Sequence, residues 1–157
     1  MSYISLSEHK KPWIFNRTDL PISDDDRLAI KPMTEARAAT LWKALISKQT
    51  DHPDFFRKGD WPFSIETWKE EGEWESVWDS DAVSLPEMIQ AHLPWEANTV
   101  VYYCNDQQSV IETTWATFQR CWKNFLFMDD GALLVAKKRP EAVQFLSNGS
   151  FRIGTKP

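Results

Sequence analysis

The sequence predicts an α+β fold, with a mainly helical N-terminal half and an antiparallel sheet in the C-terminal half, arranged in the order ββαβββ. Apolar residues recur at helical spacing in the first half, whereas runs of β-branched and aromatic residues alternate with turn residues in the second half. We expect the helices to cover one face of the sheet. Because a chain of 157 residues can bury one sizeable core, residues 1–157 are expected to form a single globular domain.

The N-terminal half is predicted to contain one well-marked helix. Thr34 is the expected N-cap, and the helix should run to about Ser47 because apolar residues repeat along one of its faces. The residues of that face are Ala38, Leu41, Trp42, Leu45 and Ile46. Before this helix we expect a short strand over 13–16 and a turn over 20–26.

The following segment carries weaker signals. Its Pro, Gly and Asp residues predict an irregular loop over 49–64. A second helix is predicted over 64–79. This helix would be broken at Gly72 and would place on one face Ile65, Trp68, Trp74 and Trp78. Ser84 and Glu87 form a capping-box pair, which predicts a short helix that stops at Pro94.

The C-terminal half is predicted to be a sheet with one helix. Residues 99–104 and 109–112 should form a hairpin. A helix over 114–124, capped by Thr113 or Thr114, should pack on the sheet because its apolar face is broad. After a turn at Asp129-Asp130-Gly131, we expect a meander of three strands, over 133–138, 142–147 and 151–153. Asn148-Gly149 predicts a type I′ turn between the last two strands.

The composition excludes several classes of protein. The net charge of −5 argues against a nucleic-acid-binding protein, which needs clustered Lys and Arg. No apolar run is long enough to span a bilayer, and the first residues do not form a signal peptide. We therefore expect a cytoplasmic protein without a membrane partner, in which Cys104 and Cys121 stay reduced. No cofactor and no metal are predicted.

The charges are unevenly distributed. Residues 60–87 contain nine acids and one base, a net charge of −8, whereas residues 113–157 carry +4 and include Lys137-Lys138-Arg139. The two segments can face each other, remain solvated, or bind a partner. A partner of the acidic segment would need a basic surface.

Six of the nine tryptophans fall into two predicted groups. Trp42, Trp115 and Trp122 lie on apolar helical faces and are expected in the core. The other predicted group is exposed and forms a binding surface with nearby acids and phenylalanines, namely Phe55, Phe56, Trp61, Phe63, Glu71, Trp74, Glu75 and Trp78. The leading hypothesis is a non-catalytic cytoplasmic protein that binds another protein through this surface. The alternative is that these aromatics form a second small core under the long loop.

Two further functions remain open. An imidazole flanked by carboxylates can act as a general base or metal ligand, so a small hydrolase or metal-assisted enzyme would be centred on His52 with Asp51, Asp54 and Asp60. A carbohydrate or small-ligand binder would instead use stacked Trp side chains. No phosphate-binding loop, Cys-x-x-Cys pair, His-Glu-x-x-His motif or Gly-x-Ser-x-Gly elbow is present.

Several segments resemble a family of uncharacterised proteobacterial proteins. They are Ile30-Lys31-Pro32-Met33 with Glu35-Ala36-Arg37-Ala38, His52-Pro53-Asp54 with Lys58-Gly59-Asp60-Trp61, Val110 to Trp115, Cys121 to Phe127, and Asp129-Asp130-Gly131. The resemblance implies a bacterial cytoplasmic protein and brings no activity, ligand or catalytic residue. In architecture and charge the chain is also similar to bacterial immunity proteins, which are small acidic α+β domains that neutralise a toxin.

Overall fold

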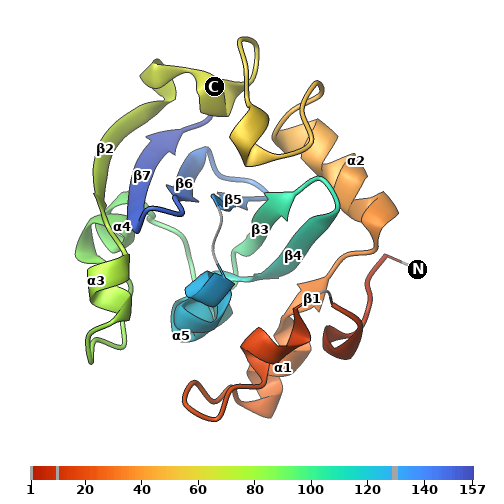
Figure 1. Cartoon of the computed structure of the whole chain (residues 1–157), viewed down its shortest axis with the longest axis vertical. Helices are drawn as coiled ribbons and strands as arrows, with labels where there is room; N and C mark the ends of the chain where they lie inside the picture. Colours follow the sequence, from red (N-terminus) through yellow and green to blue (C-terminus); the bar gives the residue numbers. More distant parts are fainter. Residues whose placement is uncertain (1, 10, 129–130) are drawn as a thin grey trace.

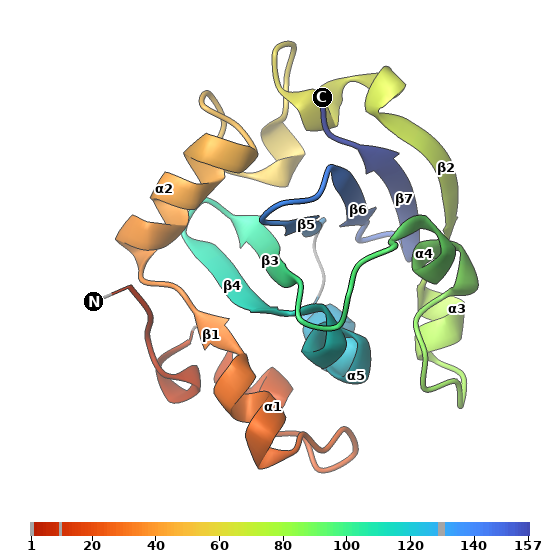
Figure 2. The same cartoon turned by 180° about the vertical axis from the view of Figure 1, so that it is seen from behind.

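The computed structural model describes residues 2–9, 11–128 and 131–157, and its central element is a seven-stranded antiparallel sheet. The strands are β1 (Lys31–Pro32), β2 (Trp68–Glu73), β3 (Val100–Asp106), β4 (Ser109–Thr114), β5 (Leu133–Ala136), β6 (Glu141–Phe145) and β7 (Ser150–Thr155). Their order across the sheet is β1-β4-β3-β5-β6-β7-β2. Figures 1 and 2 show the strands as an arc with β1 and β2 at its two ends.

The helices are short. They are α1 (Asp24–Ala29), α2 (Glu35–Leu45), α3 (Glu75–Trp78), α4 (Glu87–His92) and α5 (Trp115–Phe125). Turns of 3-10 helix occur at η1 (Leu6–Glu8), η2 (Pro12–Phe15), η3 (Pro53–Phe55), η4 (Trp61–Phe63), η5 (Ile65–Thr67) and η6 (Leu126–Met128). Among the described residues, no helix is both long enough and apolar enough to cross a bilayer.

Both faces of the sheet are covered, which corrects the prediction of helices on one face. Successive strand residues point to opposite faces. On β3, Val101 and Tyr103 pack in the cluster that contains the α5 residues, whereas Tyr102 and Cys104 pack in the cluster that contains the α2 residues. We call these the α5 face and the α2 face. All four residues of β5 are buried because both faces are covered.

The two long helices agree with the sequence prediction. Thr34 caps α2 by accepting a hydrogen bond from the Arg37 amide, and Thr114 caps α5 by accepting one from the Thr117 amide. Trp42 is fully buried, as predicted. The predicted packing of α5 on the sheet is confirmed, and the β3–β4 hairpin and the β5–β6–β7 meander are present.

The predicted helix over 64–79 is wrong. This segment forms η5, then β2, and then the single turn α3. β2 pairs with β7, so its stability comes from a strand that is distant in the sequence. Gly72 lies against the buried Phe151 ring so closely that an added Cβ would be 2.5 Å from Phe151 Cζ. The glycine therefore allows β2 to approach β7, where a side chain would obstruct it.

The division into a helical half and a sheet half is only partly correct. β1 and β2 come from the first half and form the two edges of the sheet, so the sheet has two strands more than the predicted five. The expected strand over 13–16 is η2, and the expected turn over 20–26 contains the start of α1. Ser23 caps α1 by accepting a hydrogen bond from the Asp26 amide, and three acids in the first turn of α1 favour the helix.

Two local predictions also fail. α4 begins at Glu87 with Pro86 at the N-cap, and no side-chain capping bond forms, so the Ser84–Glu87 capping box is wrong. The hairpin at Asn148-Gly149 is not type I′, because among the described non-glycine residues none has positive φ. The Gly149 amide donates to the Leu146 carbonyl, and Gly149 has φ +90°, as in a type I turn followed by a glycine bulge. Of the turn predicted at Asp129-Asp130-Gly131, residues 129 and 130 lie outside the described residues.

Candidate functional site

His52 acts as a cap for a helical turn. Its Nδ1 accepts a hydrogen bond from the Asp54 amide at 3.1 Å, at the start of η3. The Asp54 carboxylate lies 3.6 Å from the same nitrogen and is largely exposed. Asp51 is exposed, and its main-chain carbonyl accepts a hydrogen bond from the Gln107 amide. These contacts order the loop and tie it to the β3–β4 turn.

Asp60 is buried and organises the same loop from within. Its carboxylate accepts hydrogen bonds from Ser47 Oγ, Thr50 Oγ1 and the Arg57 amide. Burial raises the pKa of Asp60, but the hydrogen bonds from the loop outweigh burial and hold the pKa below its usual value. These three donors belong to the loop and to the residues that directly follow α2, so the Asp60 carboxylate is engaged with them rather than with His52. Within the described residues, no group of three or more His, Cys, Asp or Glu could hold a metal ion.

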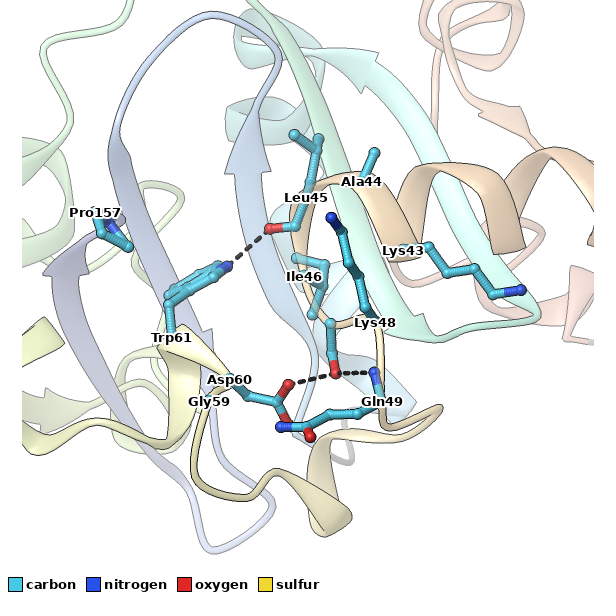
Figure 3. Close-up of a pocket in the computed structure, with 11 residues that line it drawn as sticks. Lys43, Ala44, Leu45, Ile46, Lys48, Gln49, Gly59, Asp60, Trp61 and Pro157 are labelled. Atoms are coloured by element: carbon cyan, nitrogen blue, oxygen red, sulfur yellow. Dashed lines mark hydrogen bonds between the residues drawn. The ribbon is translucent and has the colours of Figure 1, made fainter.

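A pocket of about 430 Å³ opens where this loop meets the C-terminal end of α2. Figure 3 shows Trp61 and Asp60 pointing toward the helix end. Trp61 Nε1 donates to the Leu45 carbonyl at 2.8 Å, and Asp60 binds Ser47. Lys43 and Lys48 line the pocket. Their positive charges lie near the C-terminal end of α2, where the helix dipole favours cations. The polar groups of the pocket wall are thus used to join the loop to α2.

The tryptophans expected at the surface are mostly anchored in the structure. Trp74 is buried, with 7 % of its surface exposed, and donates to the Leu146 carbonyl, so its predicted exposure is wrong. Trp78 and Trp61 are half-buried, and the indole of Trp78 donates to the Lys123 carbonyl. The rings of Trp61 and Trp68 are tilted by 41° at 6.1 Å, so they do not form parallel walls for a sugar. Trp42, Trp115 and Trp122 are buried as predicted.

The phenylalanines of the predicted surface have different environments. Phe56 is half-buried and stacks on Trp42, with 6.0 Å between the ring centroids. Phe55 and Phe63 are exposed, at 64 % and 54 %. Ile65, just before β2, is 87 % exposed. Phe63 and Ile65 lie in the segment that leads into β2, so they offer apolar side chains to a partner next to this acidic strand.

The two acids of the predicted surface, Glu71 and Glu75, lie among other exposed acids along and beside β2. We call this group the acidic strip, and all of its members are exposed: Glu66, Glu70, Glu71, Glu73 and Glu75. Within the described ranges, β2 pairs with β7 alone. Figures 1 and 2 both show β2 at the rim of the sheet, with α3 and α4 beside its C-terminal end. The strip therefore borders an open sheet edge.

Arg152 of β7 lies opposite Glu71 and is the residue that sequence reasoning missed. Its guanidinium stacks 4.3 Å from the centre of the Trp68 ring and donates to Gln144 Oε1 and to the Pro62 carbonyl. Burial lowers the pKa of Arg152, and the charge of Glu71 opposes this effect. Its position could have been inferred only from the pairing of β2 with β7.

Lys137 and Lys138 lie elsewhere. They are exposed and line a pocket with Glu96, Asn98 and Thr99. The basic residues near the chain's C-terminal end are thus split, and Arg152 is the one that contacts the segment around β2. One half-buried guanidinium leaves most of the negative charge of the acidic strip facing solvent.

The chain belongs to the family described as "Protein of unknown function (DUF2947)", whose model matches residues 3–154. The family resemblance of the sequence is confirmed to this extent. No curated protein and no solved structure matches the chain.

Proposed function

We propose that this member of the DUF2947 family is a non-catalytic cytoplasmic protein that binds another protein through the acidic strip. The partner has a basic surface. An immunity-protein-like role, in which a small acidic domain neutralises a toxin, is one form of this proposal. The two free, buried cysteines, Cys104 and Cys121, are consistent with a reducing compartment.

The observation that carries the proposal is the concentration of exposed carboxylates along an open strand edge. Like charges placed close together destabilise the folded chain through mutual repulsion. A basic partner would remove that cost and would be attracted at long range, which raises the association rate. Phe63 and Ile65 add exposed apolar surface, which favours a protein partner over a simple ion.

A structural role for the strip is the competing explanation. Charged side chains on an edge strand prevent pairing with another copy of the same chain, and this function needs no partner. The two explanations make different predictions for charge reversal. In the structural explanation, no partner is held by the carboxylates, so reversing two of them changes no partner binding.

The test compares Glu71→Lys with Glu75→Lys, as a double variant, against a matched double variant, Asp51→Lys with Glu96→Lys. All four acids are exposed, and both pairs change the net charge equally. A partner is first captured with the wild-type chain and identified, and its affinity is then measured at two ionic strengths. The proposal predicts that the strip variant loses binding while the matched variant retains it. Equal binding by both variants would show that the strip is a solvated surface.

A further inference from the structure

We infer that the partner binds by adding an extended, basic segment to the open edge of β2, as an eighth strand of the sheet. This inference rests on the proposed function, because it specifies how the acidic strip engages its partner. The main-chain groups of β2 would supply the affinity, and its carboxylates would select the charge of the incoming strand.

The register of β2 identifies the main-chain groups that are free. The Trp74 amide donates to the Gly149 carbonyl, which marks this pair as hydrogen-bonded. In an antiparallel ladder, hydrogen-bonded pairs alternate with non-bonded pairs. Gly72 lies two residues before Trp74, and its partner Phe151 lies two residues after Gly149, so this pair is hydrogen-bonded as well. Gly72 therefore also directs its main-chain groups toward β7. Glu71 and Glu73 therefore direct their N–H and C=O groups toward the open edge.

The β6–β7 pairing supports this register independently. The Leu146 amide donates to the Ser150 carbonyl, so Ser150 and Arg152 direct their main-chain groups toward β6. Phe151 and Ile153 must then face β2, which agrees with the alternation deduced from Trp74. The outward orientation of Glu71 and Glu73 thus follows from two separate hydrogen bonds.

The opposite edge of the sheet offers no such surface. β1 has two residues, one of which is Pro32, and proline has no N–H to donate. Tyr3 forms a bridge with Met33 next to β1, and the Ile4 amide donates to the Pro32 carbonyl. Of the two edges that the structure describes, β2 is the longer, with six residues, and it is the one left uncovered.

The charge of the strip selects the kind of strand that can be added. In an antiparallel addition, a residue directly opposite Glu71 or Glu73 would exchange two main-chain hydrogen bonds with it and point its side chain to the same face. Lys or Arg at those positions would form opposite-charge pairs. A second copy of β2 would instead bring Glu against Glu, which is destabilising. The occupant is therefore a basic segment of another protein.

The defined probe is a peptide of alternating threonine and lysine, about six to eight residues long to match an ordinary strand. Its twin has a methyl group on each lysine main-chain nitrogen. The twin keeps the charge but cannot place lysines opposite Glu71 and Glu73 with their main-chain hydrogen bonds. At low salt, we expect the parent peptide to bind the full chain and the methylated peptide to bind at least about tenfold more weakly.

The matched protein variants are Glu71→Pro and Glu71→Gln. Both remove the same carboxylate, but only proline removes the outward N–H. Proline is tolerated at an edge position whose N–H faces solvent, so the fold should survive. We expect Glu71→Pro to weaken the binding of the parent peptide about tenfold more than Glu71→Gln does. If the proline variant does not fold, the two peptides still decide the question on the wild-type chain.

The outcomes separate the two proposals. Equal binding of the two peptides, or no binding of the parent peptide, would overturn strand addition. If reversal of Glu71 and Glu75 still abolished capture of the natural partner, the proposed function would stand and only the binding mode would be wrong. If that reversal also had no effect on the natural partner, the proposed function would fail as well.

Discussion

Gly154 of β7 has no room for a side chain beside the Thr67 backbone, and it provides the sharpest stability prediction. A Cβ added to Gly154 would lie 2.2 Å from the Thr67 carbonyl oxygen and 2.9 Å from Trp68 Cε3. Ordinary contacts of carbon atoms begin near about 3.5 Å. In Gly154→Ala, the start of β2 must therefore move by roughly 1 Å.

The cost of that movement can be estimated. Added methyl groups in packed sites cost about 1 to 3 kcal/mol, and the upper end applies here because the obstructing atom belongs to the backbone. For a chain of this size, about 3 kcal/mol corresponds to a decrease in Tm of roughly 6 to 12 °C. Displacement of Trp68 would also disturb its contact with Arg152.

Thermal and urea unfolding, followed by circular dichroism and by tryptophan fluorescence, measure the effect. The control is Thr155→Ala, which changes the next residue of β7 to alanine at a half-buried position. We expect the control to cost less than about 1 kcal/mol. A free energy of unfolding for Gly154→Ala within about 0.5 kcal/mol of the wild-type value would refute the close packing of β2 on β7.

Three further perturbations test other parts of the fold. Trp122→Ala should lower the free energy of unfolding by about 3 to 5 kcal/mol, because the side chain is almost fully buried, and an unchanged denaturant midpoint would remove it from the core. Gly149→Val should destabilise the last hairpin, because Gly149 has φ +90° and an added Cβ would lie 2.8 Å from Glu75 Oε2. If this variant were as stable as the wild type, the turn would lie elsewhere. The hydrogen bond from Arg120 lowers the pKa of Asp26, so the stability that this carboxyl contributes is present at neutral pH and is lost as pH falls below about 4 through the lowered pKa. The difference in urea midpoint between wild type and Asp26→Asn should therefore shrink between pH 6 and about pH 3, and a constant difference would contradict the ion pair.

The parts of the fold that could be predicted from sequence carry local signals. α2 and α5 each have a polar N-cap, Thr34 or Thr114, followed by an apolar stripe, and both signals lie within a dozen residues. The β5–β6–β7 meander is likewise formed by neighbouring segments with short turns. The missed α1 also had a local signal, since Ser23 precedes three acids.

The parts that could not be predicted depend on distant partners. β2 is an edge strand with one neighbour, so its exposed acids do not alternate with apolar residues, and Trp68 and Trp74 resemble a helical stripe. β1 has two residues and no recognisable pattern. Without the β2–β7 register, neither the open edge nor the position of Arg152 can be inferred.

The exposure of the tryptophans was also decided by distant contacts. An indole N–H needs a hydrogen-bond partner when it is buried, and nearby acids suggested that Trp74 and Trp78 would remain at the surface. Their partners are the carbonyls of Leu146 and Lys123, more than forty residues away in the sequence. The acidic character of the surface could be predicted from composition, whereas the burial of the Trp74 side chain could not.

Residue-resolved amide hydrogen exchange across β2 tests the open acidic edge most directly. In the free chain, the amide of Gly72 should exchange slowly because it faces β7, whereas the amides of Glu71 and Glu73 should exchange rapidly because they face solvent. Addition of the threonine–lysine peptide should slow exchange at Glu71 and Glu73 and leave Gly72 unchanged. Slow exchange at Glu71 and Glu73 in the free chain, or exchange that the peptide does not alter, would contradict an open edge that accepts a basic strand.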